Sequence, residues 1–177
     1  KLQFILFLKR LPNLQKLSIA GSLSQDNPSL IEQFGQFVSS STTLKELNVS
    51  GNEYGVLRTS IIPLLKDMQN NKSIEALDVS NNNFGEQGLR ALQELLLSSK
   101  SIRWINFSGN KIDSSEALVS FFDSMEGRKL PLKFEFPMED IKRLYFSRWG
   151  IETSFRKLKY TIGLSCFHSY KVEFIEQ

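Results

Sequence analysis

Four stretches of the chain share one order of hydrophobic and polar positions. Apolar residues occupy the first, fourth and sixth positions of each, which is typical of a short strand with one buried face. Position nine is asparagine in all but the first, where Ser22 stands, and an asparagine there can hydrogen-bond the backbone where the strand turns. The stretches start 30, 30 and 28 residues apart and read LQKLSIAGS from Leu14, LKELNVSGN from Leu44, IEALDVSNN from Ile74 and IRWINFSGN from Ile102.

A helical pattern follows each of these stretches. The four patterns read PSLIEQFGQFVSS, SIIPLLKDMQNN, GLRALQELLLSS and SEALVSFFDSM. Within the third, Leu89, Leu92, Leu95 and Leu96 recur at helical spacing, so that one stripe can face the strands. A strand and a helix in each unit, stacked side by side, predict an α/β solenoid with parallel inner strands and outer helices. The opening KLQFILFLKRLP is expected to be the last turns of a helix, so that the chain begins inside a unit.

The period and the motif resemble the ribonuclease-inhibitor type of leucine-rich repeat over residues 1–130. The general character of the repeat sequence is similar to that of the actin-regulatory relatives of tropomodulin. This predicts an interaction scaffold that binds a protein partner on the concave face of its strands. The side chains expected to point out of that face are Lys16, Glu46, Asn48, Asp78, Trp104 and Asn106. Trp104 has two interpretations: it packs under the C-terminal segment, or it anchors a partner, as tryptophan does in many interfaces.

The repeat register is expected to fail near Leu130. LPLKFEFP predicts one more strand, with Leu132, Phe134 and Phe136 on one side. The segment from Met138 onward then runs helically, with an apolar stripe beside a polar stripe of Tyr145, Arg148, Glu152 and Lys159. From spacing alone, an ion-paired and solvent-exposed helix face is the simpler interpretation of that polar stripe.

The motif Tyr145-x2-Arg148-x3-Glu152-x6-Lys159 resembles the signature of insertion-sequence transposases of the DDE class, and the neighbouring RWGIETSFRKLKYTIGL and FHSYKVEFIEQ are similar to that group as well. The resemblance covers Pro137 to Gln177 and implies a helical segment derived from a ribonuclease-H-like fold. It implies that Glu152 is the third metal-binding carboxylate of the family, and that Tyr145, Arg148 and Lys159 lie near the DNA backbone.

A complete site of this family also needs two upstream aspartates, and the region that should carry them is the repeat array. Asp78, Asp113 and Asp123 are present there without the family's local context. One carboxylate cannot hold two metal ions between attacking and leaving oxygens. The chain is therefore predicted not to be an enzyme and to have no cofactor, since Mg²⁺ would be needed only by a complete site.

The charge is separated along the chain. Residues 141–177 hold seven Lys and Arg against three Asp and Glu, a net +4, whereas residues 1–140 hold 15 against 16, a net −1. Non-specific DNA binding by this basic segment, as a transposase remnant, is the alternative function. The predicted division is a repeat array over 1–130 and a transposase-like segment over 131–177. Both a natural gene fusion and an artificial joining of fragments near 130–138 stay open.

The single cysteine, Cys166, excludes an internal disulfide and predicts a reducing, cytoplasmic (intracellular) location. Ordinary packed or surface roles are expected for Cys166 and for His168 beside it, since neither has a partner at catalytic or metal-ligand spacing. No run reaches the roughly 18–20 apolar residues of a membrane span, so no membrane partner is expected.

Overall fold

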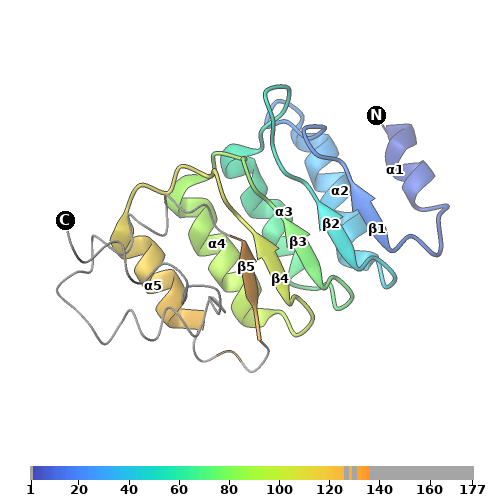
Figure 1. Ribbon diagram of the computed structural model, residues 1–177. Helices are drawn as coiled ribbons and strands as arrows, with labels where there is room; N and C mark the ends of the chain where they lie inside the picture. Colours follow the sequence, from blue (N-terminus) through green and yellow to red (C-terminus); the bar gives the residue numbers. More distant parts are fainter. Residues whose placement is uncertain (1, 126–127, 129–130, 136–177) are drawn as a thin grey trace, which may run out of the picture.

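In the computed structural model, which describes residues 2–125, 128 and 131–135, five parallel strands form one sheet with helices along one side (Figure 1). The strands lie in the sheet in the order in which they occur in the sequence. The predicted α/β arrangement of parallel strands covered by helices is confirmed. The elements are α1 Leu2–Leu8, β1 Lys16–Ser18, α2 Pro28–Ser40, β2 Glu46–Asn48, the 3-10 turn η1 Arg58–Ser60, α3 Ile61–Met68, β3 Ala76–Asp78, α4 Gly85–Ser98, β4 Trp104–Asn106, α5 Ser115–Met125 and β5 Lys133–Glu135.

The central residue of every strand points toward the helices. Leu17, Leu47, Leu77, Ile105 and Phe134 pair across the sheet in one continuous row. Since side chains alternate along a strand, the residues before and after each of these point to the opposite face of the sheet. That opposite face is called the strand face below.

The helices bury the apolar stripes that the sequence predicts. In α4, Leu89, Leu92, Leu95 and Leu96 are all buried against the sheet and the neighbouring helices. At the far end of the array, four aromatic rings close the core: Phe107 and Phe121 have centroids 5.1 Å apart, and Phe122 and Phe134 5.2 Å. Contacts at these distances between tilted rings add to the burial of the side chains, so this end of the described array is well packed.

The fifth strand is present where LPLKFEFP predicts it, but the expected failure of the repeat register near Leu130 is wrong. β5 pairs with β4 in parallel, Trp104 to Lys133 and Asn106 to Glu135, a spacing of 29 residues. Phe134 takes the place of the central leucine and is buried. Parallel pairing needs only backbone donors and acceptors and one apolar side chain toward the core, so the strand forms without the rest of the motif. β5 therefore belongs to the same sheet as the four repeat strands, and the division at 130–131 stays a prediction.

Candidate functional site

The strand face displays two rows of side chains that cross all five strands. The register places Lys16, Glu46, Ala76, Trp104 and Lys133 in a first row, and Ser18, Asn48, Asp78, Asn106 and Glu135 in a second row. The six residues that the sequence predicts for this face all lie in these rows. Their role in binding a partner stays a prediction.

Three polar residues of the second row hold the ends of their strands. The side-chain oxygens of Asn48, Asp78 and Asn106 accept the backbone N–H two residues further on, at 2.9, 2.9 and 3.1 Å. The hydroxyls of Ser80 and Ser108 donate to the same oxygens in β3 and β4. These side chains therefore stabilise the turn that follows each strand, in addition to facing outward.

Charged residues on the β1 to β3 side of the sheet form ion pairs between neighbouring strands. Lys16 Nζ lies 2.7 Å from Glu46 Oε1, and Lys45 Nζ lies 2.8 Å from Glu75 Oε1. The hydrogen bond and charge of Lys45 lower the pKa of the Glu75 carboxyl, and the charge of Arg103 adds a smaller effect in the same direction. Each of these pairs is exposed to solvent, so it aligns side chains more than it stabilises the fold.

Trp104 stands at the start of β4, with Ala76 on one side and Lys133 on the other. It is half-buried, and so is Ala76. Arg103, the residue before it, is exposed and donates its backbone N–H to Glu75 O at 2.7 Å. Both interpretations of Trp104 stay predictions, since the C-terminal segment that one of them requires lies outside the described residues.

Asparagines at position nine join successive repeats through buried hydrogen bonds. Asn82 Oδ1 accepts the backbone N–H of Leu57 at 3.0 Å, and Asn82 Nδ2 donates to Val49 O at 2.9 Å, both in the preceding unit. Asn110 Oδ1 accepts the backbone N–H of Asn82 at 2.8 Å. The predicted hydrogen bonding of the backbone at the turn is confirmed for these two asparagines and for Asn52, whose side chain accepts the N–H groups of Tyr54 and Gly55. Asn52 differs from the other two because it is exposed and these bonds stay within its own 52–55 turn.

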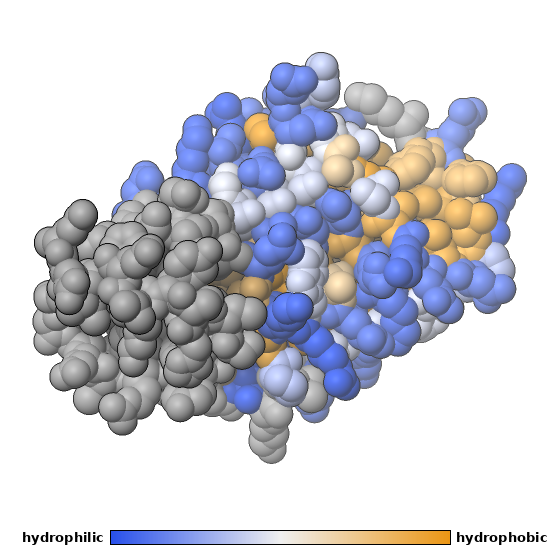
Figure 2. Space-filling view, in the orientation of Figure 1, coloured by the Kyte–Doolittle hydropathy of each residue, from blue (hydrophilic) through white to orange (hydrophobic). Residues whose placement is uncertain are grey.

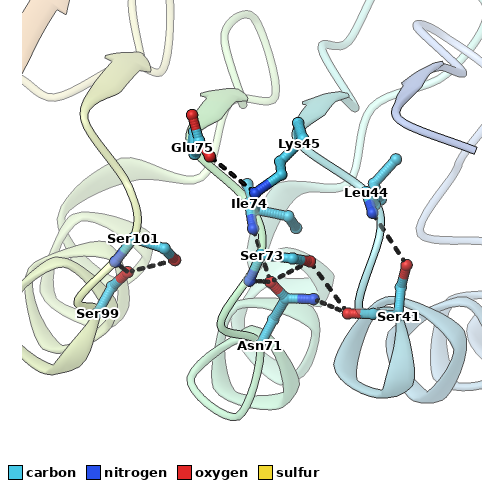
Figure 3. Close-up of polar contacts among 9 residues, drawn as sticks. All are labelled: Ser41, Leu44, Lys45, Asn71, Ser73, Ile74, Glu75, Ser99 and Ser101. Carbon is cyan, nitrogen blue, oxygen red and sulfur yellow. Dashed lines mark hydrogen bonds and ion pairs between the residues drawn. The ribbon is translucent and has the colours of Figure 1, made fainter.

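A second set of cross-repeat contacts lies at the opposite ends of the strands and is not apparent in the motif. Asn71 Nδ2 donates to Val38 O at 2.7 Å and to Ser41 O at 2.8 Å, at the end of α2 (Figure 3). Ser41 and Ser99 occupy the same repeat position and use their hydroxyls to accept the N–H of Leu44 and Ile102 at 3.3 and 3.2 Å. A polar residue three positions before the second, third and fourth strand motifs is the sequence signal for this set.

Arg128, which follows α5, is the counterpart of Asn71 in the fourth unit. Its Nε donates to Leu96 O at 2.7 Å, and its Nη2 donates to Ser99 O at 3.2 Å and Ile102 O at 2.7 Å. Leu96 and Ser99 stand in the third unit where Val38 and Ser41 stand in the first. Burial lowers the pKa of the guanidinium, and its buried Nη1 has no hydrogen-bond partner among the described residues. The long side chain thus reaches carbonyls at the end of α4 that would otherwise lack a donor.

Among the described residues, large apolar side chains are exposed around α1, at Leu97 on α4 and at a single turn. The first group, at the end of the array that carries α1, forms the hydrophobic area beside the first repeat in Figure 2 and consists of Phe4, Leu6, Phe7 and Leu11. Tyr54 is 82% exposed at the tip of the turn that Asn52 and Gly55 close through a backbone bridge. In the part of the chain that the structure describes, no helix combines the length and the hydrophobicity needed to cross a membrane.

The residues that carry the transposase resemblance, Tyr145, Arg148, Glu152 and Lys159, lie outside the described residues, as do Cys166 and His168. Of the upstream aspartates, Asp78 is on β3 and hydrogen-bonded to Ser80, whereas Asp123 is on the outer helix α5. Across residues 2–125, 128 and 131–135, no three His, Cys, Asp or Glu side chains gather so that they could hold a metal ion. The described carboxylates do not supply a two-metal site.

Two family models match the chain. The transposase DDE domain matches residues 54–177, and a leucine-rich repeat model matches residues 40–53. Where the structure describes the transposase match, those residues form the repeat units from the loop after β2 to β5. The transposase match and the repeat fold therefore overlap along the chain.

Three known proteins are similar to the chain. The Rho GTPase-activating protein gacW of Dictyostelium discoideum is 24% identical over 136 residues, which cover 75% of this chain and 12% of that protein. The leiomodin-1 structure of actin-binding site 2 has a TM-score of 0.67 at 12% identity, over 86% of this chain and 80% of that one. A tropomodulin C-terminal domain from Caenorhabditis elegans has a TM-score of 0.45 at 16% identity, over 82% and 98%. The leiomodin-1 likeness shows a shared fold.

Proposed function

We propose that this chain, which belongs to the transposase DDE-domain family, is a protein-binding scaffold. The proposal follows from the fold, because the described residues form a leucine-rich repeat sheet. The strand face supports the proposal. Five strands in register present two rows of outward side chains, among them the large apolar ring of Trp104. Such a ring in a row otherwise made of charged residues and an alanine is typical of a partner anchor.

Actin is the first partner to test, because the leiomodin-1 structure with the similar fold is of an actin-binding site. The experiment is co-sedimentation of the full chain with filamentous actin, and gel filtration with monomeric actin. Trp104→Ala should weaken binding at least tenfold if the ring is an anchor. Tyr54→Ala is the matched control, since it removes an aromatic side chain from the 52–55 turn, outside the five strands.

Binding that survives Trp104→Ala but not Tyr54→Ala would move the interface from the strand face to the turn. Absence of actin binding by either method would exclude actin as the partner. The circular dichroism spectra of both variants should match that of the wild type, which would show that a loss of binding is not caused by a loss of fold.

DNA binding by the basic C-terminal segment is the second candidate function. It is favoured by the family match, which runs to residue 177, and by the net +4 of residues 141–177. Strand cleavage is not part of this candidate, because Asp78, Asp113 and Asp123 lack the local sequence context of the family's two aspartates. A mobility shift at low salt that disappears at high salt and on deletion of residues 136–177 would support this function. No shift at low salt would exclude it.

A further inference from the structure

At the end of the array that carries α1, the row of helices extends one unit beyond the row of strands. α2 follows β1, α3 follows β2, α4 follows β3 and α5 follows β4, whereas within the described residues no strand precedes α1. α1 packs beside α2, as each later helix packs beside its neighbour, so it continues the layer of helices (Figure 1). The described sheet therefore ends at β1, while its cover of helices continues past that strand.

The outer edge of β1 presents backbone groups that are free to pair. The N–H of Ile19 donates to Asn48 O at 2.9 Å, so Ile19 and, two positions before it, Leu17 face β2. Because successive residues of a parallel strand bond to opposite sides, the N–H and carbonyl groups of Lys16 and Ser18 point away from β2. Among the described residues no strand lies on that side of β1.

The inner strands use the same backbone groups to bond to the strand before them. In β3, the N–H of Ala76 donates to Lys45 O at 3.0 Å, and the carbonyl of Asp78 accepts the N–H of Val49 at 2.9 Å. The equivalent bonds join β4 to β3, at 3.1 and 2.9 Å. Each of these strands has three residues, as β1 has, so a strand of this length is sufficient for pairing.

The apolar side chains at this end lack the cover that their counterparts have. Leu14 and Leu17 are half-buried, whereas the residues at the same two motif positions of the next three repeats are at most 2% exposed. On α1, Phe4 and Phe7 are 37% and 58% exposed, and Figure 2 shows the hydrophobic area to which they belong just beyond the edge of β1. A strand added beside β1 would cover these side chains.

Lys16 does not close the outer edge. A lysine on an edge strand often prevents pairing with another chain. Here the Nζ of Lys16 lies 2.7 Å from Glu46 Oε1 on β2, so the side chain extends over the strand face toward the neighbouring strand and not across the outer edge. Glu46 occupies the same position of β2, and that strand pairs on both sides, so a charged residue at this position is compatible with pairing.

We propose that the outer edge of β1 binds an extended segment of a partner protein, which adds one more strand, parallel to β1 and in front of α1. The segment carries apolar residues at the first, fourth and sixth positions of the repeat motif, because each inner strand buries these side chains. Main-chain hydrogen bonds supply affinity in this mode of binding, and the alternate side chains supply specificity. The site lies at the edge of the sheet, apart from Trp104, and so goes beyond the scaffold function proposed above.

The probe is the decapeptide TLKELNVSGN, residues 43–52 of this chain, labelled with fluorescein and followed by its anisotropy on titration with the full chain. In the sheet this segment pairs with β3 in the register that the proposal requires, with Leu47 opposite Leu77. The peptide should bind saturably. The same peptide with Leu47→Ser and Val49→Ser should bind about tenfold more weakly, since its apolar contacts are lost.

Two N-methylated peptides test the hydrogen bonds without altering the protein. N-methylation of Leu47 removes the N–H that would face β1, and should weaken binding about tenfold. N-methylation of Asn48 is the matched control, because in the sheet Asn48 bonds toward the preceding strand, so in the added strand its N–H would point away from β1. It should change the affinity less than about twofold.

Variants of the chain then locate the site. Ser18→Pro removes the outward N–H of β1 and leaves the bonds to β2 in place, since proline is tolerated on an edge strand where its nitrogen faces solvent. It should weaken binding of the unmodified peptide about tenfold. Ser18→Ala keeps the N–H and is the matched control, with an expected change below about twofold. If Ser18→Pro alters the circular dichroism spectrum, the N-methylated peptides decide the question on the unaltered chain.

Four results would overturn the proposal. These are the absence of saturable peptide binding, equal binding of the two N-methylated peptides, full binding by a folded Ser18→Pro variant, and a dimer in gel filtration that Ser18→Pro dissociates. In the last case β1 of a second copy would occupy the edge. Failure here is distinct from failure of the scaffold function, because actin binding that needs Trp104 and is unchanged in Ser18→Pro would keep the scaffold.

Discussion

Replacing Asn82 by alanine tests whether the repeats are joined by their asparagines. Asn82 is 1% exposed, and its side chain bonds two groups of the preceding unit, the N–H of Leu57 and the carbonyl of Val49. Alanine leaves both groups buried without a partner, at about 1–3 kcal/mol each. Because the bonds to Val79 O and Ser80 O are longer, at 3.2 Å, they add little. The expected loss in free energy of unfolding is about 2–5 kcal/mol.

The assay is urea unfolding of the wild type and of two variants, followed by circular dichroism. Asn52→Ala is the matched control, because it changes the same repeat position where the side chain is exposed and bonds only Tyr54 N and Gly55 N. Water can replace those bonds, so the cost should stay below about 1 kcal/mol. The midpoint should fall for Asn82→Ala at an unchanged m value. Equal losses in the two variants would refute the reasoning.

Three further predictions concern the contacts between units. Arg128→Met should lower the free energy of unfolding by about 1–3 kcal/mol in urea unfolding, because Leu96 O and Ile102 O lose their donor; an unchanged midpoint would contradict this. Gly51→Ala should destabilise the chain by more than 2 kcal/mol, roughly the cost of overpacking, because the new methyl group would collide with the carbonyl oxygen of Asn81; a thermal midpoint equal to that of the wild type would exclude the close approach. NMR titration should give Glu75 a pKa below its ordinary value, raised again by Lys45→Gln; since the folded pKa is depressed, this ion pair contributes at neutral pH and its contribution is lost as the pH falls through that pKa. An identical Glu75 titration in both proteins would show that the pair does not form.

The four phenylalanines at the end of the array show which buried positions the local sequence pattern predicts. Phe107 stands at the sixth motif position, and Phe121 and Phe122 lie within the predicted helix, so their burial follows from periodicity. Phe134 comes from a segment where the motif is lost, yet it contacts all three rings. Its placement depends on the pairing of β5 with β4, a contact between segments 29 residues apart in the sequence.

The asparagines at position nine show what the repeat motif cannot predict. Asn52 and Asn82 occupy the same place in the motif, and the sequence predicts the same role for both. Only the structure distinguishes them. The chain after Asn52 folds back into a bridged turn, and the Asn52 side chain accepts hydrogen bonds from the N–H groups of that turn. The roles of Asn71 and Arg128 were missed for a related reason, since their partners are carbonyl groups of the preceding unit.

The sequence by itself determined the repeat period, the strand and helix of each unit, the buried stripes and the residues of the strand face. These depend on the alternation of side chains along a strand and on the helical repeat, which act within a few residues. The tertiary structure decided the register of the fifth strand and the choice of asparagines that join the units. Those outcomes depend on which groups of one unit come within reach of the next, and that distance is set only when the units stack.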